Sequence, residues 1–287
     1  MTDIEGLRER SIGGLPLGLA LLCGLIAVVL VFPMSWLFIE AVTVDPNRAI
    51  DLLFRLGTAE ILLNSLLLMA GVTGLSVLLG VPLAYLTVRT DLPARRFWTI
   101  IVALPLVVPS YVGAFAFVSA FGPRGEFTDL LAPLGIEQIP EIYGLWGTIL
   151  VVTLYTYPYV YLTTRASLLS LDTTLIDAAR TLNQDRLTAF RRITLPHIRP
   201  AVVAGGLLTA LYAVSDFGTP GIMQLPVFTR QIYVEYNAFG QDYAALLSLQ
   251  LLALVLVVLV LERWVRPAAG VEGDTPDVGG ETTVELG

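Results

Sequence analysis

The sequence has almost none of the side chains that form disulfides or bind transition metals. Its 287 residues include one cysteine, Cys23, and one histidine, His197. A disulfide framework needs paired cysteines, and a zinc cluster or a Cys/His catalytic pair needs several such side chains together. The composition therefore argues against all three kinds of site, and we predict no metal site on this chain.

Lysine is absent altogether, so all 17 basic residues are arginine. The phosphate-binding loop of a nucleotide hydrolase uses a lysine to reach the β- and γ-phosphates. Without that lysine, this chain cannot carry an ordinary loop of that kind. We therefore predict a non-catalytic chain with no cofactor of its own, and any ATP-driven work would belong to another polypeptide.

Charged residues are also scarce, at 14% of the chain against 55% hydrophobic residues, and the mean hydropathy is +0.76. Soluble domains are about one quarter charged. The apolar residues form long blocks without alternation, which favours helices across a bilayer. The sequence predicts an all-α polytopic membrane protein with about six transmembrane helices, at 15–39, 61–88, 97–120, 145–165, 200–222 and 244–262. The first is longer than the apolar region of a signal peptide, so we expect it to be retained. Prolines within the blocks predict kinks at Pro33, Pro82, Pro105, Pro109 and Pro158.

The arginines predict the orientation in the membrane. With the N-terminus in the cytoplasm, 13 arginines lie in cytoplasmic segments and four lie outside, namely Arg48, Arg55, Arg124 and Arg230. Loops on the cytoplasmic side carry an excess of arginine and lysine. We therefore predict a multi-pass plasma-membrane protein with both termini cytoplasmic. The N-terminal segment is 1–14, and 15–57 holds the first transmembrane helix and an external segment. A membrane domain follows at 58–262, and the acidic composition of 263–287 predicts a disordered cytoplasmic tail.

The cytoplasmic segment 166–199 has helical periodicity. Asp172 is placed to cap one helix, Asn183 is placed to end it, and a second short helix follows from Asp185. One face of the first helix is apolar or small, at Leu168, Leu171, Leu175, Ala178, Ala179 and Leu182. The periodicity alone fits two interpretations: a hairpin that binds a partner surface, or an interfacial helix that lies passively on lipid headgroups.

Residues 177–196 resemble the EAA signature of membrane subunits of binding-protein-dependent ABC importers. That pattern is E-A-A, three residues, G, nine residues, then I-x-L-P. The matching residues, in register, are Asp177, Ala178, Ala179, Asn183, Ile193, Leu195 and Pro196. Aspartate for glutamate keeps the carboxylate, and asparagine for glycine keeps access to the left-handed turn.

The resemblance covers 58–262 and includes 64–97, YPYVYLTTRASL at 157–168 and SDFGTPGIM at 215–223. These segments are similar to the N-terminal half of iron(III)- or thiamine-type permeases, in which two such halves are usually fused. The resemblance implies a type I permease domain at 58–262 that forms half of a translocation pathway. This chain would then pair with a second permease domain, as a homodimer or with another chain, or be a shortened form.

The resemblance also implies the partners and their tasks. ATPase subunits would bind ATP and Mg, and an extracellular or periplasmic binding protein would deliver iron(III) or thiamine. Sulfate, molybdate and polyamine permeases have similar architecture. The implied ATPase-coupling residues are Asp177, Ala178, Ala179, Leu182, Asn183, Ile193, Leu195 and Pro196. The alternative is a secondary transporter driven by an ion gradient, with no ATPase.

Four polar side chains within the spans are candidates for the pathway: Asp216, Tyr157, Tyr161 and Asn64. An ionisable residue in a span is a functional candidate, but Asp216 also lies at a sequence that predicts a helix break, where it would cap a backbone end. For the tyrosines and Asn64, packing and interhelical hydrogen bonds are the alternatives. The basic residues accompany no nucleic-acid-binding motif, so we predict the lipid bilayer and no nucleic acid as a partner.

Overall fold

The structure is a computed structural model that describes residues 17–122, 125–127, 142–171, 188, 190–238 and 240–265. All regular secondary structure among these residues is helical, and none of them forms a strand. Five long apolar helices meet the requirements for crossing a membrane, and a bent helix pair makes a sixth span if its two parts are counted as one. The prediction of an all-α polytopic membrane protein is therefore confirmed.

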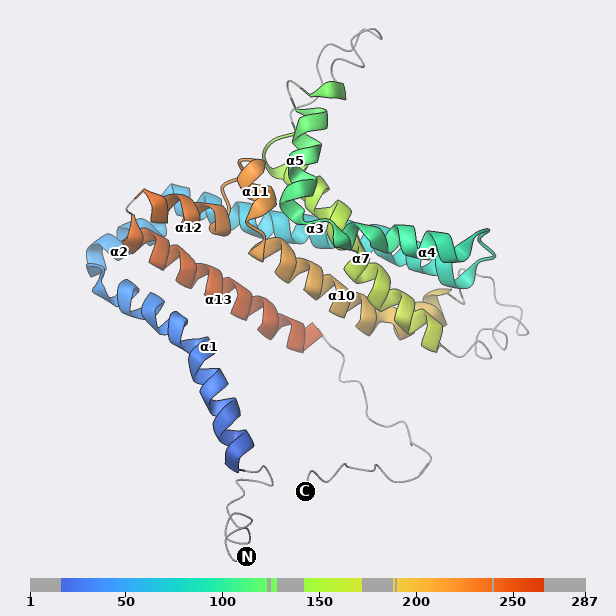
Figure 1. The fold of residues 1–287 in the computed structure, drawn as a ribbon, viewed down its shortest axis with the longest axis horizontal. Helices are drawn as coiled ribbons and strands as arrows, with labels where there is room; N and C mark the ends of the chain where they lie inside the picture. Colours follow the sequence, from blue (N-terminus) through green and yellow to red (C-terminus); the bar gives the residue numbers. More distant parts are fainter. Residues whose placement is uncertain are drawn as a thin grey trace, which may run out of the picture.

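Three long helices form the centre of the bundle: α3 (Leu56–Arg89), α7 (Leu145–Ser170) and α10 (Leu195–Ser215). Each of them packs against the other two (Figure 1). Glycines allow the close approach, because a Cβ at Gly80 would lie 2.9 Å from the backbone nitrogen of Tyr161. A Cβ at Gly205 would lie 2.7 Å from the Cα of Val160. Small residues at such crossings let membrane helices pack backbone to backbone.

The predicted span 97–120 is not one helix. It consists of α4 (Arg95–Ala103), the 3₁₀ turn η2 (Leu104–Val107) and α5 (Ser110–Phe121), and the helix axes bend by 95°. Pro109 lacks an N–H for helical bonding, and a proline disfavours helical backbone in the residue before it; Val108 is accordingly extended. The predicted kinks at Pro105 and Pro109 are confirmed, and the bend divides the predicted span into two helices. Figure 1 shows α5 leaving the bundle steeply.

The predicted span 200–222 is interrupted as well. Helix α10 ends at Ser215, and the short α11 (Gly218–Ile222) begins after a break at Asp216 and Phe217. Next comes α12 (Phe228–Asn237), which packs on α13 (Gln241–Val265). The break places the carboxylate of Asp216 within the bundle.

The end of the bundle that carries α12 also carries α2 (Pro46–Phe54) (Figure 1). Two ion pairs lie here: Arg48 with Asp242 at 3.3 Å, and Arg55 with Glu235 at 3.7 Å. The Arg55 guanidinium also lies 3.9 Å from the ring centre of Tyr243. These contacts connect α2 and the residue after it to α12 and to the start of α13.

Helix α1 (Leu17–Thr43) diverges from the other helices (Figure 1). The helix continues through Pro33 without a break. None of the residues in its most apolar 18-residue window is buried. It contacts α13. The N-terminal segment 1–14 and nearly all of the acidic tail lie outside the described residues.

Candidate functional site

Asp216 is the centre of a polar cluster at the break between α10 and α11. Its side chain is 9% exposed. One carboxylate oxygen accepts hydrogen bonds from the Ser110 hydroxyl at 2.9 Å and the Gly218 amide at 3.1 Å. The other accepts one from the Tyr155 hydroxyl at 3.0 Å, and that hydroxyl also bonds to Thr219. The carboxylate therefore caps the backbone of α11 and links it to α5 and α7.

The negative charge of Asp216 has no arginine within ion-pair distance in the described ranges. A buried carboxylate without a counter-ion needs hydrogen-bond donors to offset its desolvation, and Ser110, Tyr155 and the Gly218 amide provide three. This geometry matches the capping role weighed for Asp216 from the sequence. A direct role in the translocation pathway stays a prediction.

Tyr157 and Tyr161 lie on one face of α7, and both hydroxyls are engaged by neighbouring helices. Tyr157 donates to the backbone carbonyl of Val102 in α4 at 2.9 Å. Tyr161 is fully buried, and its hydroxyl lies 3.3 Å from the Thr87 hydroxyl in α3. Both residues belong to one core cluster with Ile198. In this conformation they hold helices together.

Asn64 faces the segment between α11 and α12. Its amide donates to the backbone carbonyl of Pro226 at 3.1 Å, and the neighbouring Ser65 hydroxyl accepts a hydrogen bond from the Phe228 amide at 3.2 Å. These bonds supply partners for backbone groups that would otherwise lie unpaired in an apolar environment. Asn64 thus positions the start of α12 in this conformation.

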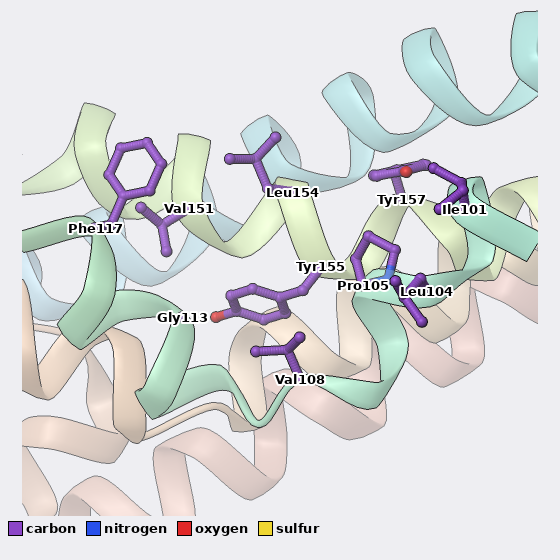
Figure 2. Close-up of a pocket in the computed structure, with 10 residues that line it drawn as sticks. All are labelled: Ile101, Leu104, Pro105, Val108, Gly113, Phe117, Val151, Leu154, Tyr155 and Tyr157. Carbon is purple, nitrogen blue, oxygen red and sulfur yellow. The ribbon is translucent and has the colours of Figure 1, made fainter. Parts of the chain in front are cut away.

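A cavity of about 420 Å³ lies in the angle between α4 and α5, against α7 (Figure 2). The Tyr155 ring lies alongside Val108 and Gly113 at the α5 side of this cavity. The lining is mostly apolar: Ile101, Leu104, Pro105, Val108, Gly113, Phe117, Val151, Leu154, Tyr155 and Tyr157. Because the Tyr155 and Tyr157 hydroxyls are bonded elsewhere, the cavity presents mainly hydrocarbon.

The predicted coupling residues divide into two groups. Five of them, Asp177, Ala178, Ala179, Leu182 and Asn183, lie outside the described residues. Ile193, Leu195 and Pro196 are described: Ile193 lies in the π-helix η4 (Phe190–Thr194), and the other two begin α10. Leu195 is 43% exposed, whereas Ile198, one turn later, is fully buried.

Described residues on either side of 172–187 contact α3. At the first end, the Arg89 guanidinium donates to the carbonyls of Leu168 at 2.8 Å and Leu171 at 3.2 Å. At the second end, the Phe190 ring packs edge-on against Tyr85, with ring centres 5.3 Å apart. The chain therefore contacts the same helix, α3, before and after this segment.

Sequence reasoning did not identify Arg89, Ser110 or Thr219 as site residues. Single hydroxyls in apolar helices and an arginine near a helix end are common, so the pattern carries no signal for them. Their partners lie 64 to 106 residues away along the chain. The adjacency of Pro109 and Ser110 offered one clue, because a helix must restart there.

The model of the family described as "Binding-protein-dependent transport system inner membrane component" matches residues 76–270. An Fe(3+)-transport system permease protein of Haemophilus influenzae is 31% identical over 252 residues, which cover 88% of this chain and 46% of that protein. The chain thus spans less than half the length of that relative. A probable molybdenum ABC transporter permease protein of Haloferax volcanii is 32% identical over 66% of this chain and 68% of its own.

Solved structures share the fold. The membrane chain matched in a bacterial alginate ABC transporter, crystallised in complex with an alginate-pentasaccharide-bound periplasmic protein, has a TM-score of 0.67. It is 19% identical, and the match covers 87% of this chain and 92% of that one. At this identity the likeness establishes the fold alone.

Proposed function

Because the chain belongs to the family of binding-protein-dependent transport system inner membrane components, we propose that it is the permease subunit of an ATP-driven importer and forms half of the translocation pathway. The family match over 76–270 is the observation that carries this proposal. The chain would pair with a second permease domain, receive its cargo from a substrate-binding protein, and depend on ATPase subunits that bind ATP and Mg. It would itself be non-catalytic.

The coupling segment is proposed to include Asp177, Ala178, Ala179, Leu182 and Asn183. A helix that transmits force from an ATPase must be attached rigidly to the spans it moves. The bonds from Arg89 to the end of α7 and the packing of Phe190 on Tyr85 support this requirement. Movement imposed on 172–187 would therefore reach α3, α7 and α10 together.

The coupling role is tested by replacing Ala178 and Ala179 with tryptophan, one at a time. We expect normal membrane insertion, loss of co-purification with the ATPase subunit and loss of ATP-dependent uptake, because the bulky ring prevents close approach. Ala253→Trp is the matched control, since Ala253 is exposed on α13 and the same ring there should leave uptake unchanged. Wild-type uptake in the Ala178 and Ala179 variants would refute the coupling role, as would failure of insertion.

ATP depletion with the ion gradients maintained separates this proposal from an ion-gradient-driven carrier. The proposed importer stops under these conditions, whereas a secondary transporter continues. Persistent uptake would refute the function proposed for this chain.

The orientation is proposed to place both termini in the cytoplasm. The one native cysteine, Cys23, allows a clean test: Ala178→Cys in a Cys23→Ser background, treated with a membrane-impermeant maleimide. We expect labelling only after the cells are permeabilised. Labelling of intact cells would place the segment outside and contradict both the orientation and the coupling role.

Iron(III) is the cargo that we propose first. The relative named for Fe(3+) transport is similar over 88% of this chain, and the sequence segments at 157–168 and 215–223 resemble iron(III)- or thiamine-type permeases. The relative named for molybdenum makes an oxyanion the second candidate, and thiamine stays a prediction from the sequence. Uptake of ⁵⁵Fe(III) and ⁹⁹Mo-molybdate by cells that carry or lack the gene distinguishes these two cargoes.

A further inference from the structure

A second cavity, of about 470 Å³, lies between the start of α5, the short α11 and α12. It is separate from the apolar cavity in the angle between α4 and α5. Aromatic side chains from three segments line it, namely Tyr111, Phe217 and Tyr233, and the Phe217 and Tyr233 ring centres are 4.9 Å apart. A Cβ at Gly221 would meet nothing nearer than the Phe217 ring, at 3.7 Å. The glycine thus leaves open space beside the aromatic wall.

Arg230 brings a positive charge to this cavity. The two other described arginines on the predicted external side are each paired with a carboxylate: Arg48 with Asp242 at 3.3 Å, and Arg55 with Glu235 at 3.7 Å. Arg230 is partly buried, and no carboxylate of the described residues lies within ion-pair distance of it. A partly desolvated guanidinium presents five N–H donors in a planar fork that matches an oxyanion.

The other side-chain polar groups in the lining are the hydroxyls of Tyr111 and Tyr233, which can also donate hydrogen bonds. Tyr111 and Tyr233 are 58% and 57% exposed, so their hydroxyls are accessible to a ligand. Two carboxylates adjoin lining residues in the sequence, and both are engaged elsewhere. Asp216 accepts from Ser110, Tyr155 and Gly218, and Glu235 is paired with Arg55 at 3.7 Å. The cavity therefore offers a cation and hydroxyl donors, without a carboxylate in its lining. This chemistry favours an anion with several acceptor oxygens and disfavours a cationic cargo.

We propose that this cavity binds an oxyanion group of the transported cargo, with Arg230 as its principal ligand. The inference rests on the proposed transport function. The oxyanion has two possible sources: it is the cargo itself, as in molybdate or sulfate, or it is a ligand that accompanies a transported metal ion, as in iron(III) citrate. In both cases the guanidinium makes a bidentate, charge-assisted contact.

The test uses the permease in complex with its ATPase in lipid nanodiscs, and isothermal titration calorimetry with molybdate, sulfate, citrate and iron(III) citrate. We expect at least one of these to bind, and Arg230→Gln to weaken it about ten- to a hundredfold, as for loss of a charged hydrogen-bonded contact. Arg230→Lys should be intermediate, because it keeps the charge and loses the planar fork. Arg48→Gln is the matched control, because it removes an arginine from the same end of the bundle and should leave the affinity unchanged.

The ligands distinguish the two sources. Binding of molybdate or sulfate alone identifies the oxyanion as the cargo, whereas binding of iron(III) citrate but of neither inorganic anion identifies it as a companion of the metal. Equal affinities of the wild-type and Arg230→Gln complexes for every ligand would overturn the proposal. It would also be overturned if no anion bound. If ATP-dependent uptake persists in any of these outcomes, the proposed transport function still holds and only the anion site is refuted. Absence of an ATPase partner would instead refute the transport function itself.

Discussion

Removal of the Asp216 carboxylate should destabilise the bundle far more than its replacement by an amide. In Asp216→Ala, the Ser110 hydroxyl, the Tyr155 hydroxyl and the Gly218 amide all lose their acceptor. Hydrogen bonds in membrane proteins contribute about 0.6 kcal/mol on average and up to about 1.7 kcal/mol. Three of them together give an expected loss of about 2–5 kcal/mol in the free energy of unfolding.

Asp216→Asn keeps one carbonyl oxygen, which can still accept from Ser110 and from the Gly218 amide. The new amide nitrogen faces the Tyr155 hydroxyl, which can act as acceptor instead of donor. We therefore expect this variant to lose only about 1 kcal/mol, because Ser110 and the Gly218 amide keep their acceptor and Tyr155 keeps a partner.

The measurement is unfolding of the purified protein by SDS titration, followed by tryptophan fluorescence and far-UV circular dichroism. Asp242→Ala is the control, because its ion pair with Arg48 is exposed, with side chains 39% and 65% accessible, and exposed pairs contribute about 0–1 kcal/mol. If the alanine and asparagine variants of Asp216 unfolded at the same SDS concentration, hydrogen bonding at the break would not be the source of stability.

Two further substitutions test the packing of the central helices with the same unfolding measurement. Gly205→Ala should lower the free energy of unfolding by about 1–3 kcal/mol through overpacking, because the new Cβ would lie 2.7 Å from the Cα of Val160. Gly74→Ala is its control, because a Cβ there would meet nothing within 4 Å. Unchanged stability of Gly205→Ala would show that the helices separate freely. Arg89→Ala should cost about 1–3 kcal/mol, because it removes donors from the carbonyls of Leu168 and Leu171 at the end of α7, and Arg89→Lys should restore part of this loss. No loss on Arg89→Ala would remove the support that these bonds lend to rigid coupling.

The positions of the helices were predictable because bilayer thickness and backbone hydrogen bonding act locally. An apolar block of about 20 residues has few alternatives to a helix in lipid. Helices α1, α3, α7 and α13 begin and end within five residues of the expected blocks, whereas α10 begins five residues before its block and ends seven residues before the block does. Local chemistry also predicted the interruptions, since Pro105 and Pro109 remove backbone donors and the Asp216 segment reads as a helix break. What these prolines did not reveal was the size of the bend, 95°, because a proline removes a hydrogen bond without setting the direction of the following helix.

The sequence by itself determined the class of the molecule, the order of its helices and its membership of a transport family, since each of these depends on composition and on motifs within short stretches. Only the tertiary structure decided the partners of each polar side chain. Asp216 meets Tyr155 and Ser110, which lie 61 and 106 positions away along the chain. Among the described residues, Arg48 and Arg55 are paired with carboxylates and Arg230 is not. The physical reason is that helix formation is set by neighbouring residues, whereas the pairing of charges and hydroxyls in an apolar bundle is set by which helix faces come together.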